Sequence, residues 1–219
     1  MCLINSHLCS VTVKLKGVYL DKFKPLPKDE NILKQLGLQG KFIVGYIGTH
    51  GMAHKLDFIL NSIIDLDDNI RFLFIGDGAE KKKLLELNKK LGLKNTVFID
   101  FVPKSEIQKY IAITDIALVP LKKSDTFKTV IPSKIFENAA MRKPILLGVE
   151  GESKEIIQSY GAGLCFEPEN PNDFIDKLMK LYTDADLYKK CQSGCEKLAL
   201  DFDRKKLARK MLEVIKIKK

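Results

Sequence analysis

Short apolar runs alternate with amphipathic stretches from residue 42 onward. Six runs are apolar on both faces and rich in β-branched or aromatic residues, as is typical of strands buried in a parallel sheet. They are residues 42–48, 70–76, 96–102, 115–121, 143–149 and 162–168. Between them apolar residues recur at helical spacing, for example Leu56, Ile59, Leu60 and Ile63. This alternation predicts an α/β fold, a Rossmann-like open parallel sheet of about six strands with helices on both faces.

The two ends of the chain follow other patterns. Residues 171–217 contain only helical stretches, and the last of them has an apolar stripe, within residues 208–215, that needs a partner. Before the first run, residues 11–29 ("VTVKLKGVYLDKFKPLPKD") predict one strand, a turn at Gly17 and an extended connection that contains prolines.

Composition excludes several classes of protein. Of the 219 residues, 45% are hydrophobic and 30% charged, as in a globular protein of one large or two small domains. There is no run of 18 apolar residues, so no transmembrane helix is predicted. The first ten residues, "MCLINSHLCS", lack the basic region of a secretory signal. Five scattered cysteines, an odd number, favour reduced thiols.

The net charge of +9 lies mostly at the C-terminus, where residues 204–219 carry eight basic side chains against one acidic residue, Glu213. A basic terminal helix is most often a solvated face and less often a peripheral contact with an anionic membrane. Because no basic groove interleaved with aromatic residues accompanies it, we do not expect nucleic acid as a partner.

The first strand is followed by a glycine-containing loop, Gly48, Thr49, His50 and Gly51, at the edge where open α/β sheets bind ligands. Glycines allow close approach of the backbone, and a helix N-terminus suits a phosphate, although such a turn also has a packing use. The glycines at 45, 48 and 51 fit neither a P-loop nor a dinucleotide fingerprint.

His50 and His54 are four residues apart, but the HExxH pattern is absent and no third ligand is apparent, so we expect no metal site. A hydrogen bond to a phosphate or sugar oxygen is the better use of either imidazole, and an ordinary loop or helix position is the alternative. Gly76 and Gly78 after the second run, and Val102 after the third, are further strand ends at this edge.

The longest irregular link, residues 122–132, leads to Ser133, Lys134 and Glu137. Links of this length in compact α/β units are often functional. The structural alternative is that Ser133 caps a helix and that Lys134 and Glu137, three residues apart, form a stabilising pair.

Five segments together resemble a known family. "FIVGYIGTHGMAHKLDFIL", "FLFIGDGAEKKKL", "ITDIALVPL", "TVIPSKIFENAAMRKPILL" and "GAGLCFEPENP" are similar, in order and spacing, to the donor-binding half of group 1 (family 4) glycosyltransferases with the two-domain GT-B fold. The similarity runs from about residue 10 to the C-terminus, and the P-S-K-[IL]-x-E segment is its most specific element. Within the family the chain most resembles bacterial L-fucosamine-transferase-like members that assemble surface polysaccharide.

The resemblance implies that Lys134 and Glu137 are the catalytic residues. Glu137 would accept hydrogen bonds from the ribose hydroxyls of the donor, while Lys134 and Ser133 would lie near its diphosphate. It also implies donor-binding positions in the loops at the strand ends, with Val102 meeting the nucleobase through its main chain. Those loop positions are Gly48, Thr49, His50, Gly51, Gly76, Gly78 and Val102.

Three positions depart from the family pattern. Thr129 stands where many members have the first glutamate of E-x7-E, and Thr49 where many have an arginine, so the donor sugar stays open. Arg142 replaces the usual glycine between helix and strand, and that helix must therefore end without its easiest left-handed residue.

As a whole, the resemblance implies a hexosyl-type glycosyltransferase that uses a UDP- or GDP-sugar without a metal cofactor. It would act with retention on an acceptor hydroxyl in polysaccharide or glycolipid assembly, in the cytoplasm and at the inner face of the cell membrane. Residues 1–27 would be the linker and final strand region of a missing N-terminal acceptor domain, 28–200 the nucleotide-sugar-binding domain, and 201–219 a basic helix crossing to that missing domain.

A non-catalytic nucleotide-sugar-binding subunit, completed by a separate acceptor-domain chain, is the alternative. A phosphatase- or receiver-like protein is disfavoured because no acidic cluster follows the first strand.

Overall fold

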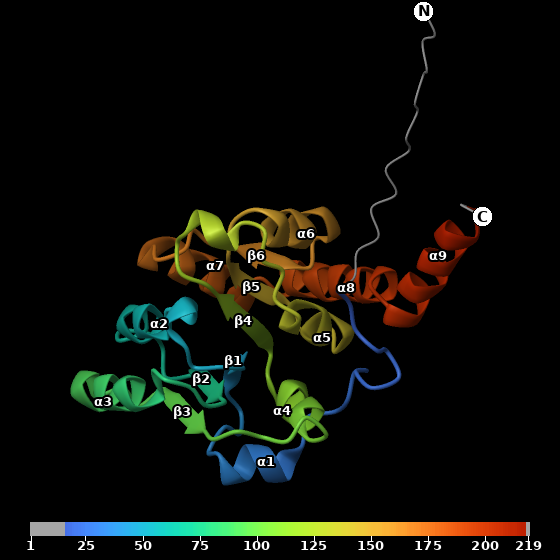
Figure 1. The fold of residues 1–219 in the computed structure, drawn as a ribbon. Coiled ribbons are helices and arrows are strands. Elements are labelled where there is room, and N and C mark those ends of the chain that lie inside the picture. Colours follow the sequence, from blue (N-terminus) through green and yellow to red (C-terminus); the bar gives the residue numbers. More distant parts are fainter. Residues whose placement is uncertain (1–15, 218–219) are drawn as a thin grey trace, which may run out of the picture.

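A computed structural model describes residues 16–217, so most of the strand expected near residues 11–16 lies outside the described part of the chain. The fold is built on one sheet of six parallel strands in the order β3-β2-β1-β4-β5-β6 (Figure 1). The strands are β1 (Phe42–Ile47), β2 (Ile70–Ile75), β3 (Thr96–Ile99), β4 (Ile116–Pro120), β5 (Ile145–Gly148) and β6 (Gly163–Cys165). The predicted fold class is confirmed.

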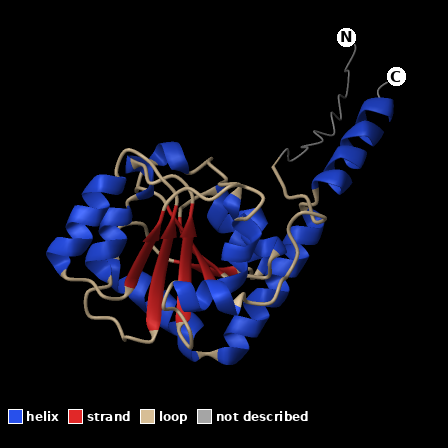
Figure 2. Cartoon of the chain, turned by 90° about the horizontal axis from the view of Figure 1, so that it is seen from below, coloured by secondary structure: helices blue, strands red, loops and turns tan. Residues whose placement is uncertain are grey.

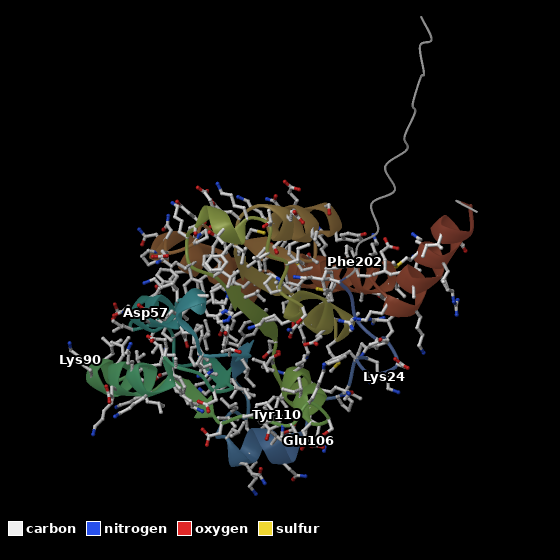
Figure 3. The ribbon with its side chains drawn as sticks, viewed as in Figure 1. Lys24, Asp57, Lys90, Glu106, Tyr110 and Phe202 are labelled. Carbon is white, nitrogen blue, oxygen red and sulfur yellow. The ribbon has the colours of Figure 1, made fainter. Side chains whose placement is uncertain are left out.

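Helices cover both faces of the sheet (Figure 2). One face packs against α2 (Leu56–Ser62), α3 (Lys81–Leu91) and α7 (Pro171–Thr183). The other packs against α1 (Glu30–Gln35), α4 (Ile107–Ile113), α5 (Lys134–Ala140), α6 (Glu152–Tyr160) and α8 (Ala185–Asp201). Successive side chains of a strand point to opposite faces of the sheet. Tyr46 of β1 therefore lies in the apolar core on the first face, and Ile43 in the core on the second. Tyr110 of α4, labelled in Figure 3, packs against the apolar cluster on this second face, which includes Leu33 of α1.

Strand β3 is shorter than its apolar run. Its register pairs Ile99 with Ile75, the last residue of β2, so the ladder ends there because β2 offers no further partner. Residues 100–102, predicted as strand, instead form a connection that leaves the edge of the sheet.

At the C-terminal end, α9 (Arg204–Ile217) extends away from the body of the fold (Figures 1 and 2). Phe202, at the end of α8, stacks on Phe136 of α5 with ring centroids 4.7 Å apart (Figure 3). The side chains of Met211, Leu212 and Ile215 are exposed on α9. Among the described helices none combines the length and apolarity needed to span a bilayer.

The turn predicted at Gly17 is wrong. The chain turns at residues 20–22, and Gly17 is in no turn. The glycine has a packing role instead, because a Cβ there would overlap the carbonyl oxygen of Phe202. Next to it, Val18 pairs with Asp203 in an isolated bridge.

Candidate functional site

The strand order reverses between β1 and β4, and ligands of open α/β sheets bind outside the carboxyl ends of the strands at such a point. A cleft of about 440 Å³ lies here and is lined by residues from four separate segments. They are Phe23, Ile47, Gly48, Thr49, His54, Phe101, Val102, Lys104, Ile107, Pro132, Ser133, Lys134 and Glu137. A smaller hollow of about 200 Å³ shares Gly48, Thr49 and Val102 with this cleft and adds Gly76.

Lys134, the first residue of α5, carries a buried ammonium group into the cleft. Its Nζ makes no hydrogen bond within residues 16–217 and lies 4.0 Å from the centroid of the Tyr46 ring. Burial lowers the pKa of Lys134 to about 7, and the nearby carboxylate of Glu137 only partly opposes this. An unpartnered buried cation is costly. A bound anion would relieve that cost.

Glu137 lies one turn further along α5, on the same wall of the cleft. No ion pair or hydrogen bond to the described residues occupies its carboxylate, so the pair between Lys134 and Glu137 that was the structural alternative does not form. Burial raises the pKa of Glu137, while Lys104 and Lys134 partly offset this effect. A free carboxylate in this position can accept hydrogen bonds from ligand hydroxyls.

Ser133 precedes α5 but does not cap it, contrary to the structural alternative drawn from the sequence. Its backbone is already helical (φ −61°, ψ −29°), whereas a capping serine needs an extended conformation to turn its hydroxyl back to the helix amides. The side chain makes no cap hydrogen bond and lines the cleft.

The glycine loop after β1 contributes shape more than hydrogen-bond donors. The amide of Gly48 donates to Ile75 and that of His50 to Asp77, so both are already used. The amide of Thr49 makes no hydrogen bond within the described part of the chain and remains a donor. Gly48 has a φ of +148°, and a Cβ there would stand 2.7 Å from the Nζ of Lys134. Glycine is therefore what lets the ammonium reach the loop.

Gly76 and Gly78 bring the second loop against the first. A Cβ on Gly76 would overlap the carbonyl oxygen of Gly48, and one on Gly78 would meet the carbonyl group of His50. Both glycines also have φ in the left-handed half of the map, +139° and +155°. Gly76 borders the smaller hollow, whereas Gly78 lines neither of the two spaces at this edge.

The two histidines occupy different environments. His50 is fully buried between the rings of Tyr46 and Phe98, at 5.8 and 6.2 Å, and neither ring nitrogen has a partner within residues 16–217. His54 lines the cleft. Burial lowers the pKa of each to about 4, so both imidazoles are neutral at pH 7. No cluster of three or more histidine, cysteine or acidic side chains, as a metal ion would need, occurs in the described part of the chain.

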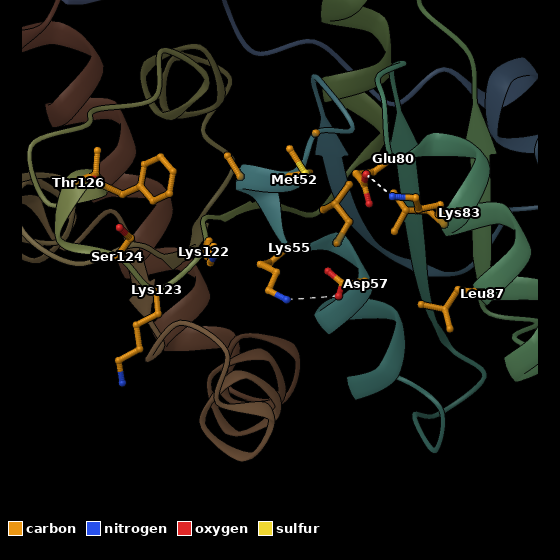
Figure 4. Close-up of a pocket in the computed structure, with 15 residues that line it drawn as sticks. Met52, Lys55, Asp57, Glu80, Lys83, Leu87, Lys122, Lys123, Ser124 and Thr126 are labelled. Atoms are coloured by element: carbon orange, nitrogen blue, oxygen red, sulfur yellow. Dashed lines mark hydrogen bonds and ion pairs between the residues drawn. The ribbon is translucent and has the colours of Figure 1, made fainter.

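Gly51 lines a neighbouring, larger hollow of about 880 Å³ (Figure 4). Its lysines include Lys55, which pairs with Asp57 at 3.4 Å, and Lys83, which pairs with Glu80 at 2.9 Å. Lys123 pairs with Glu167, and Lys122, the remaining lysine of this hollow, is exposed to solvent, whereas the ammonium in the smaller cleft is buried and has no partner within residues 16–217. The smaller cleft is therefore the better candidate for an anionic ligand, despite its size.

Six of the residues that the sequence predicts at the site line a single cleft in the structure. They are Gly48, Thr49, Val102, Ser133, Lys134 and Glu137. Tyr46 was missed and was counted only as a strand residue. The available signal was the tyrosine hydroxyl, the one polar side-chain group in the run 42–48, two positions before Gly48. Phe101 was also missed because its position falls inside a predicted strand, and Lys104 because nothing in its spacing distinguishes it from other loop residues.

Comparison with known proteins identifies the family. The model of the glycosyl transferases group 1 family matches residues 28–197. A Bacillus subtilis protein with the provisional name teichuronic acid biosynthesis glycosyltransferase TuaH is 30% identical over 142 residues, which are 63% of this chain and 34% of that protein. The aligned regions span between 33 and 39% of the length of the curated relatives.

Solved structures share the fold. Anabaena HepE, in complex with UDP and glucose, superposes with a TM-score of 0.79 at 18% identity over 91% of this chain and 55% of its own. The C-terminal domain of the group 1 glycosyl transferase LpcC from Francisella tularensis superposes with a TM-score of 0.70 at 22% identity, over 84% of this chain and 97% of that domain. The family match covers well over half of the chain, and the chain therefore belongs to the group 1 glycosyltransferases.

Proposed function

We propose that this chain is the donor-binding half of a glycosyltransferase and that the cleft at the β1–β4 switch point binds the nucleoside diphosphate of a UDP- or GDP-sugar. The observation that carries this proposal is the ammonium of Lys134, buried at the cleft with no hydrogen-bond partner among residues 16–217. A diphosphate placed there supplies the missing acceptors. The free carboxylate of Glu137 then accepts hydrogen bonds from the ribose, and the main chain at Val102 meets the base.

In the proposed reaction the bond between the anomeric carbon and the diphosphate oxygen breaks. An acceptor hydroxyl oxygen forms the new bond with retention of configuration, and its proton passes to the leaving diphosphate oxygen. Negative charge grows on the leaving diphosphate, and the nearby Lys134 cation stabilises it. Because the protein supplies this charge itself, no metal cofactor is part of the proposal.

The identity of the substrates is the finer part of the proposal. The resemblance to L-fucosamine-transferase-like members supports transfer of a hexosyl-type sugar to a polysaccharide or glycolipid intermediate, and the sugar itself stays open because Thr49 and Thr129 depart from the family pattern. Residues 28–200 would form the donor domain, with residues 1–27 as the linker to the acceptor half of the GT-B fold. That half would be a further domain or a partner chain, reached by the helix at 201–219. The exposed apolar side chains and basic residues of α9 also suit contact with the inner face of the cell membrane.

The experiment is thermal unfolding with UDP or GDP. At a ligand concentration 100 times Kd, binding stabilises a protein by about 2.7 kcal/mol, which corresponds to a rise in Tm of about 5–10 °C for a domain of this size. We expect UDP or GDP to give such a rise with the wild-type protein, and Glu137→Ala to abolish it.

Glu155→Ala is the matched control, because Glu155 is also the fourth residue of its helix but is exposed on α6. It should keep the full rise. A wild-type protein that is protected by neither nucleotide would refute the proposed function. Turnover of a nucleotide sugar, measured with and without an acceptor-domain partner, then separates an enzyme from a binding subunit.

A further inference from the structure

Tyr46 contacts both parts of the cleft that would face a phosphate. It is fully buried as the fifth residue of β1. Its hydroxyl donates a 2.6 Å hydrogen bond to the carbonyl oxygen of Thr49, and its ring lies 4.0 Å from the Nζ of Lys134. One side chain therefore touches the loop and the cation together.

The orientation of this ring is fixed by its neighbours. His54 packs edge-on at a centroid distance of 5.7 Å, and His50 and Phe74 pack against it at 5.8 and 6.3 Å. Burial raises the pKa of Tyr46 far above its usual value, so the hydroxyl remains a donor. The ring therefore has packed neighbours on several sides, and the ammonium beside it has no hydrogen-bond partner within residues 16–217.

The contact between Lys134 and Tyr46 has a chemical consequence that an ion pair would lack. The negative face of an aromatic ring attracts a cation within about 6 Å. It neither neutralises the charge nor uses the three N–H donors of the ammonium as a carboxylate would. Lys134 is thus held in place while its charge and donors stay available to an anion.

We propose that Tyr46 is a positioning residue of the donor site: its ring holds the Lys134 ammonium at the cleft, and its hydroxyl fixes the loop through Thr49. This role rests on the proposed function, since it requires a donor diphosphate in the cleft. Tyr46 touches neither the sugar nor the phosphates and acts through Lys134 and the loop.

A double-mutant cycle tests the role, with affinity for UDP or GDP measured by calorimetry. Removing the ring with Tyr46→Leu should weaken binding about tenfold in the wild-type background. In a Lys134→Met background the same substitution should cost less than about twofold, because the cation that the ring positions is gone. Tyr46→Phe keeps the ring and loses only the bond to Thr49, so it should restore most of the coupling to Lys134.

Tyr188 provides the matched control. Its hydroxyl also donates to a backbone carbonyl, that of Asp115 at 2.9 Å, but at the opposite edge of the sheet. Tyr188→Leu should destabilise the fold and leave the affinity of the folded protein unchanged. Should Tyr46→Leu fail to fold, fluorinated phenylalanines at position 46 keep the shape of the ring and weaken its negative face. Affinity should then fall as fluorine is added.

The outcomes are distinct. The positioning role would be overturned if Tyr46→Leu lowered the affinity for UDP or GDP equally in the wild-type and Lys134→Met backgrounds, or if fluorination of the ring left that affinity unchanged. Either result would leave nucleotide binding itself intact. Absence of nucleotide binding by the wild-type protein would overturn the proposed function and this role together.

Discussion

The protonation of Lys134 should change when the donor binds. In the empty cleft burial lowers its pKa to about 7, so about half of the molecules carry the charge at pH 7 and about one in ten at pH 8. A diphosphate next to the Nζ favours the charged form and moves the pKa back toward its ordinary value of about 10.4. Binding should therefore take up about 0.5 proton at pH 7 and about 0.9 at pH 8.

Titration calorimetry in buffers of different ionisation enthalpy measures this proton uptake directly. UDP is a suitable probe at pH 8, because the second pKa of a terminal phosphate is about 6 and the ligand has no proton to lose. The same linkage makes affinity fall by up to about tenfold per pH unit above pH 8. Lys134→Arg keeps the charge and cannot titrate in this range, so it should bind UDP without proton uptake.

The control is a second buried lysine. Burial lowers the pKa of Lys143 to about 8, but its Nζ donates to the carbonyl oxygens of Ala112 and Thr114, away from the cleft. Lys143→Arg should leave the uptake at its wild-type value. If UDP binds with no proton uptake at pH 8, or if Lys134→Arg takes up as much as the wild type, the assignment of the diphosphate to Lys134 is wrong.

Three further predictions concern the framework of the site. Gly76→Ala should lower the free energy of unfolding, measured by chemical denaturation, by about 3 kcal/mol, because the new Cβ overlaps the backbone of Gly48. Gly51→Ala is the control: Gly51 has an ordinary φ of −113°, so the substitution should change the free energy of unfolding by less than about 0.5 kcal/mol. His50 has a pKa of about 4 when buried and 6.5 when unfolded, so it binds a proton more readily in the unfolded chain. Protonation of His50 should by itself lower the free energy of unfolding by up to about 3 kcal/mol from pH 6.5 to pH 4, beside a similar contribution from His54, and His50→Leu should remove the part that belongs to His50; an unchanged slope would exclude His50 as a source. Asp115→Ala should cost about 2 kcal/mol in the same denaturation assay, because the amide of Ile43 loses its acceptor; a cost near zero would contradict this account.

The fold was predictable because its signal is carried by local periodicity. Six runs that are apolar on both faces, separated by apolar residues at helical spacing, leave few alternatives to an open parallel sheet. The carboxyl ends of these strands then locate the edge of the sheet where the cleft lies. The end of helix α5 also follows the family pattern in its backbone. Arg142, which stands where the family has a glycine, adopts the left-handed conformation with a φ of +53°. Its guanidinium is paired with Glu196, an interaction that the sequence did not indicate.

The electrostatic state of the site was not predictable, because it depends on atoms that meet only in three dimensions. Residue spacing alone suggested that Lys134 and Glu137 pair with each other and that Ser133 caps the helix. The structure instead buries the Nζ of Lys134 against Tyr46, 88 positions away in sequence and on another element. No periodicity relates these two residues. Similarly, the packing of Gly76 on Gly48 is a contact between loops that each look like an ordinary strand-to-helix turn.

These observations change which part of the site would bind the phosphates. The loop after β1 looks like a cradle of amides in sequence, yet the amides of Gly48 and His50 are already committed to the neighbouring loop and strand. What the loop provides is space. Because Gly48 has no side chain, the ammonium of Lys134 can lie next to it, and because Gly76 has none, the backbone of Gly48 can lie next to Gly76. A larger side chain at either position would move the cation rather than block a ligand. Glycine is therefore required in this loop because of the position of Lys134. Substitutions of these glycines should alter the affinity for an anion mainly by displacing that lysine.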